Sequence, residues 1–356
     1  MPPARPLVVT SDADLLEDLL RIAATAAVEV EVAPDAGAAR RSWAGAPAVV
    51  VGPDAALGCG RLRLPRRPGV VLLGDDLDDA GIWQLAVEVG AEHVVFLPDA
   101  QAWLMELLAE AVEPSSTSGR VLAVVGGRGG AGATTLAAAL AVTAARQGRR
   151  TMLVDGDPLG GGIDLVFGGE GDHGLRWPEL GATRGRLPGA TLTGALPRMN
   201  ELSVLSWDRG QAMSVPVEAM ESVLDAGRRS SDVVVVDLPR QTDACSRTAL
   251  QVASLVLLVV PAEVRAAAAA SRVAAQLAPA CADLRLVVRG PAPSGLGADE
   301  VAEALGLPLA GYVRGEPGLD LALDRGEPPA GRGRGPLSVL CERVLDEVLP
   351  PVRGAA

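Results

Sequence analysis

Short runs of β-branched and aliphatic residues alternate along the chain with longer stretches whose apolar residues recur every three or four positions. Near the start, five such runs predict strands at residues 6–10, 28–33, 48–52, 69–74 and 93–97. Helical stretches lie between them, and a last one at 100–112 closes the series. Because strands that alternate with helices form a parallel sheet covered on both faces, we predict a doubly wound α/β domain at residues 1–112.

The polar segment EPSSTSG at residues 113–119 has no hydrophobic periodicity and predicts a linker. Beyond it, further strands are predicted at residues 121–125, 151–157, 201–207, 231–239, 253–261 and 283–290. Helices between them are predicted near residues 134–148, 216–229, 263–279 and 298–306. The alternation predicts a second, larger doubly wound domain at residues 120–356. Such sheets bind ligands at the carboxyl ends of their strands.

Composition narrows the classes of function that the chain can have. The formal net charge is −12, which argues against general DNA binding because DNA-binding surfaces concentrate positive charge against phosphates. The four cysteines are scattered, and neither they nor the two histidines have metal-ligand spacing. No apolar run is long enough to span a membrane, and Asp12 and Asp14 interrupt the region where a signal peptide would be apolar. These features predict a cytoplasmic protein without a membrane-spanning segment.

A glycine-rich loop, GGRGGAGATT at residues 126–135, follows the first strand of the second domain. Gly127, Gly129 and Gly132 have the spacing of the dinucleotide-binding fingerprint, and Asp155 at the end of the next strand would then bind a ribose. The same loop also fits a P-loop, in which backbone amides surround phosphate and a threonine hydroxyl binds Mg²⁺. A third interpretation is a glycine turn without a ligand, since the chain holds 42 glycines.

Acidic residues elsewhere in the domain favour the P-loop interpretation. A P-loop ATPase has a second Asp at the end of a buried strand, and Asp237 lies at the end of the valine-rich run at 231–239. It also has an acidic loop near the γ-phosphate, and the segment DGDPLGGGID provides Asp155, Asp157 and Asp164. A dinucleotide site explains neither feature.

These motifs make the second domain resemble the MinD/ParA family of ATPases with a deviant Walker A motif. GGRGGAGATT is similar to the family's KGGxGKTT, and the resemblance extends over residues 120–350. The segments Asp155–Pro158 and Val236–Pro239 look like its two switch loops. With its receiver-like, flavodoxin-type first domain, the chain is similar to the TadZ/CpaE branch. The stretch Trp207–Gly210 is similar to the actinobacterial, septum site-determining form of that branch. The resemblance implies a P-loop NTPase-like fold for residues 120–356.

The resemblance also implies a ligand and a set of site residues. The ligand is ATP or ADP with Mg²⁺, bound with reduced affinity. Thr134 would bind the Mg²⁺ ion, Asp237 would act on it through water, and Asp155 would be a further metal-site residue. Asp157 would orient the water for hydrolysis. The loop residues that would contact the nucleotide are Gly127, Arg128, Gly129, Gly130, Ala131, Gly132, Ala133, Thr134 and Thr135.

Departures from the family pattern weaken the implied activity. Arg128 stands where the family's first lysine reaches across a dimer, and Ala133 stands where the second contacts the β- and γ-phosphates. A missing charge-assisted contact costs about 1.5–3 kcal/mol, and charge neutralisation is most of phosphoryl-transfer catalysis. Arg289 stands where relatives have an Asn near the adenine. We therefore expect nucleotide binding with weak or absent hydrolysis.

The first domain lacks the residues that receiver domains use for phosphotransfer. Its third strand ends at Gly52 instead of an acceptor Asp, and its fifth strand ends at Leu97 without the usual Lys. We interpret this domain as a pseudo-receiver, in which Asp12 and Asp54 only cap helices or turns.

Three hypotheses for the function follow. In the first, the resemblance implies a positioning protein that responds to nucleotide, forms a homodimer and works with cell-division or with pilus or secretion machinery at the cell pole or septum. In the second, the chain is a pseudo-ATPase scaffold that binds partners without nucleotide. In the third, it is an NAD(P)-dependent enzyme, against which Asp237 and the paired acids of the second domain argue.

Overall fold

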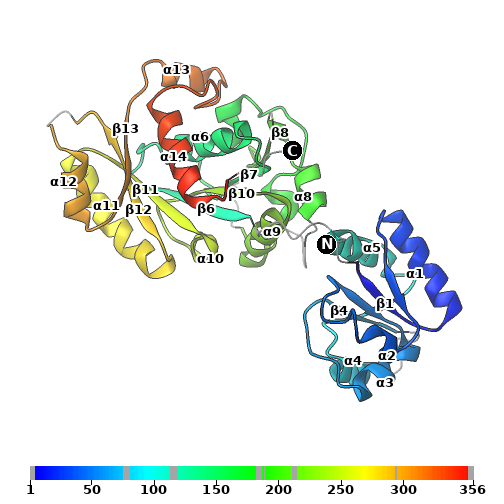
Figure 1. Ribbon diagram of the computed structural model, residues 1–356. Coiled ribbons are helices and arrows are strands. Elements are labelled where there is room, and N and C mark those ends of the chain that lie inside the picture. Colours follow the sequence, from blue (N-terminus) through cyan, green and yellow to red (C-terminus); the bar gives the residue numbers. More distant parts are fainter. Residues whose placement is uncertain are drawn as a thin grey trace. The chain divides into compact units, whose positions relative to one another are not determined.

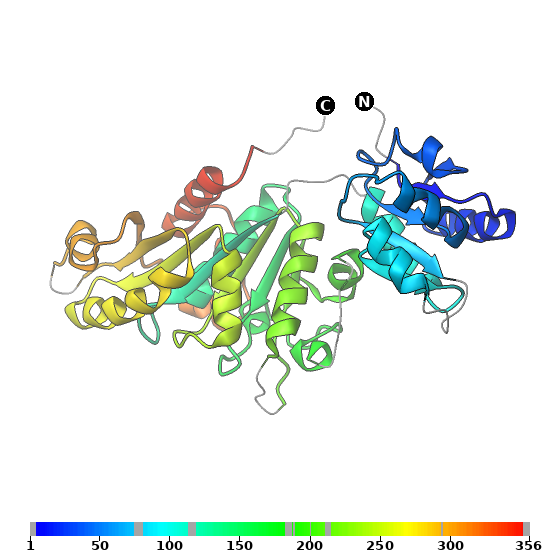
Figure 2. The same cartoon turned by 90° about the horizontal axis from the view of Figure 1, so that it is seen from below.

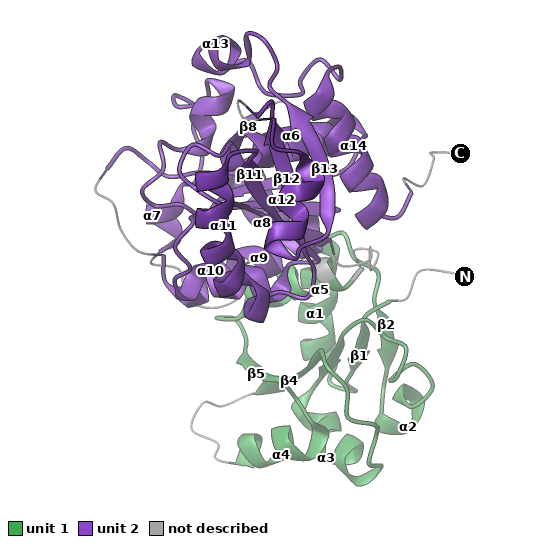
Figure 3. Cartoon of the chain, turned by 90° about the vertical axis from the view of Figure 1, so that its left-hand side faces the viewer, with its two compact units in different colours: residues 1–116 green, residues 117–356 purple. Residues whose placement is uncertain are grey.

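The computed structural model describes residues 5–74, 81–112, 119–181, 187, 189–199, 201–210, 215–292 and 295–351 of the chain. The chain divides into two compact units, residues 1–116 and 117–356, which Figure 3 draws in different colours. Of the predicted linker, residues 113–118 lie outside the described residues and only Gly119 is described. Each unit is an α/β fold built on its own mainly parallel sheet, as the hydrophobic pattern predicts.

The first unit has a five-stranded parallel sheet. Its strands are β1 (Leu7–Val9), β2 (Glu31–Ala33), β3 (Val49–Val51), β4 (Val70–Gly74) and β5 (His93–Phe96). They follow the order β2-β1-β3-β4-β5, which is the strand order of flavodoxin-type doubly wound sheets. One face is covered by α1 (Ala13–Thr25) and α5 (Gln101–Val112), the other by α2 (Ala36–Ala39), α3 (Pro53–Arg61) and α4 (Gly81–Val89).

Alternate side chains of these strands point to opposite faces and build two apolar layers. Leu7 and Val9 pack in the layer of α2, α3 and α4, whereas Val8 between them packs with Leu104 of α5. The helix α3 was not predicted, because two glycines interrupt its nine-residue segment. Its small buried residues nevertheless pack closely on the sheet.

The second unit has an eight-stranded sheet, including two strands that the sequence did not indicate. Its strands are β6 (Arg120–Gly126), β7 (Thr151–Asp155), β8 (Arg198–Met199), β9 (Leu202–Leu205), β10 (Val233–Leu238), β11 (Leu255–Pro261), β12 (Leu284–Gly290) and β13 (Leu309–Arg314). Their order is β13-β12-β11-β6-β10-β7-β9-β8, and among the strands that the structure describes here only β8 and β9 pair antiparallel. The unexpected strands β8 and β13 lie at the edges, where partial exposure removes the continuous apolar run of a central strand.

Helices cover both faces of this sheet (Figures 1 and 2). One face carries α6 (Ala133–Arg146), the short helix η1 (Ile163–Phe167), α13 (Leu319–Asp324) and α14 (Pro336–Val348). The other carries α7 (Trp177–Leu180), α8 (Gly189–Ala195), α9 (Val217–Ser230), α10 (Ala244–Val252), α11 (Val264–Leu277), η2 (Ala278–Ala280) and α12 (Ala298–Leu305). Among the helices of the described residues, none combines the length and the apolar character needed to cross a membrane.

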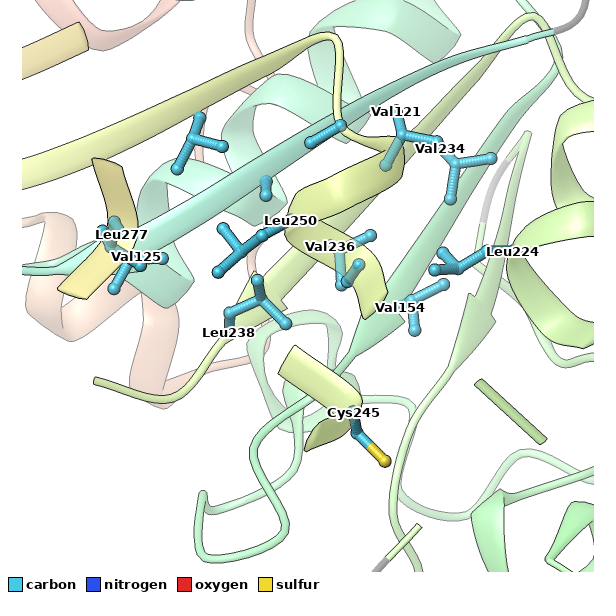
Figure 4. Packing of buried hydrophobic residues seen from close by; sticks show 14 of the residues in the cluster. Val121, Val125, Val154, Leu224, Val234, Val236, Leu238, Cys245, Leu250 and Leu277 are labelled. Carbon is cyan, nitrogen blue, oxygen red and sulfur yellow. The ribbon is translucent and has the colours of Figure 1, made fainter. Parts of the chain in front are cut away.

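The central strands β6 and β10 are buried on both faces, which explains why their sequences are dominated by valine and leucine. Figure 4 shows Val121 of β6 and Val234 and Val236 of β10 in one cluster with Leu224 of α9 and Leu250 of α10. The other side chains of these strands pack against α6. This packing fixes the carboxyl ends of β6, β7 and β10 next to one another.

We predict that a protease at low concentration cuts the full chain first within residues 113–119 and leaves two folded fragments. Each unit has its own apolar core, whereas the segment between them is polar. Mass spectrometry of the early fragments, followed by circular dichroism, measures both outcomes. Early cuts inside residues 5–110 without a lasting fragment would contradict this domain boundary.

Candidate functional site

The glycine loop connects the end of β6 to the start of α6. Gly127 donates its amide to the Val259 carbonyl at 2.8 Å, and a Cβ on Gly127 would lie 2.8 Å from the Cβ of Ala270. Gly132 has a φ of +97°, a left-handed conformation that other residues rarely adopt, and it directly precedes α6. These two glycines let the chain pass close to β11 and α11 and then turn into the helix.

The start of α6 presents hydrogen-bond donors that the described part of the chain does not use. Within that part, the backbone amides of Gly132, Ala133, Thr134 and Thr135 donate to no acceptor. The helix is 14 residues long, and its dipole places partial positive charge at this end. Helix ends of this kind bind phosphate, so the loop can hold an anion even though residue 133 is alanine.

Two buried carboxylates lie beside the loop, at the carboxyl ends of β7 and β10. Asp155 and Asp237 are register partners on these adjacent parallel strands and are 2% and 4% exposed. The Thr134 hydroxyl donates to Asp237 Oδ2 at 2.6 Å. Burial is the main cause that raises the pKa of Asp155 and the pKa of Asp237 to about 7, and neighbouring acidic groups add to it.

The two carboxylates have no ion-pair partner within the described residues. A divalent cation would supply the missing positive charge, and Mg²⁺ binds carboxylate and hydroxyl oxygens while keeping waters and phosphate oxygens as further ligands. No group of three or more His, Cys, Asp or Glu side chains in the described ranges could hold a metal ion alone. The donor set therefore fits Mg²⁺ that arrives with a phosphate ligand.

Asp155 also holds the loop that follows β7. Its Oδ1 accepts from the Asp157 amide at 3.1 Å, and its Oδ2 accepts from the Ile163 amide at 2.8 Å. Asp157 in turn accepts from the Leu159 amide at 3.0 Å. The fold brings Asp157 close to the acid pair and bonds it to the loop backbone, and its role in hydrolysis stays a prediction.

Asp164, the third acid of this segment, is fully buried in an ion-pair cluster. The Nη1 and Nη2 atoms of Arg209 donate to Asp164 Oδ2 and Oδ1, both at 3.0 Å. The Nη2 of Arg176 lies 3.3 Å from Asp164 Oδ2, and the Ser206 hydroxyl donates to Oδ1 at 3.1 Å. Asp164 thus anchors the far end of the loop. Sequence reasoning missed both arginines, because Arg209 is 45 residues away and no local pattern links the two.

Arg128 forms an ion pair within its own chain. Its Nη2 donates to Glu263 Oε1 at 2.7 Å, and both side chains are more than a third exposed. Glu263 immediately precedes α11 and was not identified from the sequence. The contact of Arg128 across a dimer stays a prediction.

A cavity of about 270 Å³ opens beside the loop, at the ends of β11, β12 and β13. Gly132 and Thr135 line it on the loop side, and Leu319 of α13 lines it on another. Arg289 also lines it, with Nη2 donating to the Gly130 carbonyl at 3.2 Å. The volume is close to the lower end of small-molecule sites, about 300 Å³.

The acids Asp12 and Asp54 of the first unit both accept hydrogen bonds within that unit. Asp12 caps α1 by accepting from two amides of the first turn. Asp54 accepts from the Thr10 hydroxyl and from the amide and hydroxyl of Ser11 at 2.7–2.8 Å. The strand β3 ends at Val51, one residue before the predicted end, and Gly52 is the N-cap of α3. The expectation that these acids cap helices or turns is confirmed for Asp12 and is wrong for Asp54, whose partners lie 43 and 44 residues away in the chain.

Comparison with known proteins identifies a family for each unit. Residues 9–119 match the Rv3660c-like, CheY-like N-terminal domain, and residues 122–314 match the CobQ/CobB/MinD/ParA nucleotide binding domain. The chain is 43% identical over 344 residues to Rv3660c of Mycobacterium tuberculosis (strain ATCC 25618 / H37Rv), a match that covers 96% of each protein.

Solved structures share the fold of the second unit. The ParA family ATPase from Chlorobium tepidum TLS has a TM-score of 0.58 at 15% identity, covering 65% of this chain and 99% of that protein. The septum site-determining protein MinD from Pyrococcus horikoshii OT3, complexed with Mg-ADP, has a TM-score of 0.50 at 18% identity, covering 64% and 95%. The predicted P-loop NTPase-like fold is therefore confirmed, and the family match confirms the receiver-like fold of the first unit.

We predict that Asp237→Asn stabilises the metal-free protein more at pH 8 than at pH 5, by about 1–3 kcal/mol. The folded-state pKa of Asp237, about 7, lies above its ordinary value of 3.8. Between these two values the folded protein keeps a proton that the unfolded chain has lost, so its stability falls as pH rises from about 3.8 to about 7 and levels off above that. Denaturant unfolding of both proteins with a chelator present measures the difference. If the variant and the parent protein differed equally in free energy of unfolding at the two pH values, ionisation of Asp237 would not destabilise the folded protein.

Removal of Arg209 tests the anchor at Asp164. Arg209→Ala should lower the free energy of unfolding by about 1–3 kcal/mol, because Asp164 stays buried with only one arginine partner, Arg176. The matched control is Arg332→Ala, which breaks an exposed pair with Glu327 and should cost less than about 0.5 kcal/mol. Equal losses in the two variants would argue against the anchor.

Proposed function

Because the chain belongs to the CobQ/CobB/MinD/ParA nucleotide-binding family, we propose that its second unit binds Mg²⁺ with ATP or ADP and hydrolyses ATP slowly or not at all. One observation carries this proposal. Thr134 is hydrogen-bonded to the buried Asp237 beside loop amides that have no acceptor in the described residues. The arrangement offers phosphate donors and cation ligands in one place.

The proposed binding mode follows from the positions of these groups. The amides of Gly132 to Thr135 bind the phosphates, and the Thr134 hydroxyl and the acid pair hold the Mg²⁺ ion. When bound, the ion supplies positive charge to the phosphate oxygens. The cavity of about 270 Å³ next to Thr135 receives the sugar and base.

We expect slow hydrolysis because residue 133 is alanine. The methyl group of Ala133 carries no charge, and the chain contains no lysine that could take its place. Phosphoryl transfer depends on neutralising the charge that spreads over the transferred group in the transition state. Asp157 Oδ1 accepts from the Leu159 amide, so Oδ2 would be the atom that orients water.

A positioning or regulatory role is the cellular function that these features support best. Slow turnover suits a switch that holds one nucleotide state, and the first unit offers a folded surface without a phosphate acceptor at Gly52. We propose that the nucleotide-bound chain forms a homodimer in which Arg128 leaves Glu263 and contacts the partner's phosphate. Cell-division machinery is the proposed partner, with pilus or secretion machinery as the alternative.

Two competing functions differ in what the site should bind. A scaffold that needs no nucleotide is favoured by Ala133 and by the pairing of Arg128 with Glu263 inside one chain. An NAD(P)-dependent enzyme would use Asp155 to bind ribose hydroxyls. Such an enzyme does not account for the second buried acid, Asp237, which is bonded to Thr134 beside Asp155, and this argues against the dinucleotide function.

Calorimetric titration of the full chain with Mg·ATP, Mg·ADP and NAD⁺ separates the three functions. The proposal expects binding of both adenine nucleotides that a chelator weakens, and no heat from NAD⁺. Absence of binding by all three would favour the scaffold, whereas preference for NAD⁺ would favour the dinucleotide enzyme.

Ala133→Lys should tighten Mg·ATP binding by about 1.5–3 kcal/mol, roughly ten- to a hundred-fold, because it restores a charge-assisted phosphate contact. The matched control, Ala24→Lys, adds the same charge at an exposed helical position of the first unit. The control should bind like the parent protein. An Ala133→Lys variant that is folded but no tighter than the control would argue that the loop does not surround phosphate.

A further inference from the structure

The proposed nucleotide brings several negative charges to the glycine loop, next to a cavity whose lining includes acidic residues. The charged residues that line this cavity are Glu263, Glu316, Asp320, Arg289 and Arg314. The loop contributes no charge at Ala133, and the charge of Arg128 is paired with Glu263. Positive charge for phosphates bound at the loop must therefore come from side chains outside it, and Arg289 and Arg314 are the arginines that line the neighbouring cavity.

The side chain of Arg289 extends from the end of β12 to the glycine loop. Its Nη2 donates to the Gly130 carbonyl at 3.2 Å. Its Nη1 lies 3.4 Å, and its Cδ 3.8 Å, from the point that a Cβ on Gly132 would occupy. The guanidinium thus lies against the residues that lead into α6, beside the amides without acceptors.

The charge of Arg289 has no carboxylate partner within the described residues, because its one hydrogen bond goes to a neutral carbonyl. Arg128 and Arg209 differ in this respect, since each is held by an acid. A guanidinium has five donors in a planar arrangement that suits phosphate oxygens. Arg289 therefore keeps both charge and donors for a ligand in the cavity.

We propose that Arg289 is a phosphate-binding residue of this site and that it supplies, from β12, the positive charge that residue 133 lacks. The proposal rests on the nucleotide binding proposed above and adds the residue that makes it possible without lysine. It places the guanidinium on the phosphates and not on the base, because the contacts of the side chain are with Gly130 and Gly132.

The test compares adenine ligands that differ in the number of phosphate groups they carry. Calorimetry of the full chain with Mg·ATP, Mg·ADP and adenosine is carried out on the parent protein and on Arg289→Gln, Arg289→Lys and Arg272→Gln. Arg272 is an exposed arginine of α11 that does not line the cavity, so its loss controls for net charge. Unfolding curves confirm that each variant is folded.

Arg289→Gln should weaken Mg·ATP and Mg·ADP binding by about tenfold or more and leave adenosine binding unchanged. Arg289→Lys should retain most of the affinity, and Arg272→Gln should match the parent protein. In an Ala133→Lys background, Arg289→Gln should cost less than about threefold, since the new lysine provides the charge.

Other results overturn the inference in distinguishable ways. An equal loss for adenosine and ATP would assign Arg289 to the sugar or base. Unchanged nucleotide affinity in Arg289→Gln, with a parent protein that binds Mg·ATP, would refute only the role of Arg289. Absence of nucleotide binding by the parent protein would refute the proposed function and this inference together.

Discussion

Two carboxylates buried side by side are the constraint on which the second unit depends. Asp155 and Asp237 end neighbouring strands in register, and burial raises the pKa of each to about 7. Without a positive partner in the described residues, this pair is costly to ionise. A cation that binds there with phosphate would remove that cost. The same carboxylates also hold Thr134 and the loop after β7, so ligand binding and loop position are linked.

The chain has no lysine, so arginines are the basic side chains near this acid pair, and they differ in their partners. Arg209 is bound to the buried Asp164 and anchors the loop after β7. Arg128 is paired with Glu263, which lines the cavity. Arg289 contacts only a backbone carbonyl and lies against the glycine loop. Two of these guanidinium groups thus stabilise the protein itself, and the third keeps its charge for a ligand.

Local patterns predicted the architecture well, because central strands are continuous apolar runs and Asp237 follows the longest run of valines. They missed α3 and the edge strand β13, where glycines or partial exposure break the pattern. The glycine loop was recognisable because its backbone needs glycine at Gly132. The partners of Asp164 were not, because ion pairs between distant segments leave no periodic signal.

The most direct test of the central claim is the number of protons released when Mg·ADP binds at pH 7. It is measured by calorimetry in buffers of different ionisation enthalpy, for the parent protein and for Asp237→Asn. Because a cation at the acid pair must lower a pKa of about 7, the parent protein should release more protons than the variant. Equal release by the two proteins, with Mg·ADP bound to both, would contradict the account.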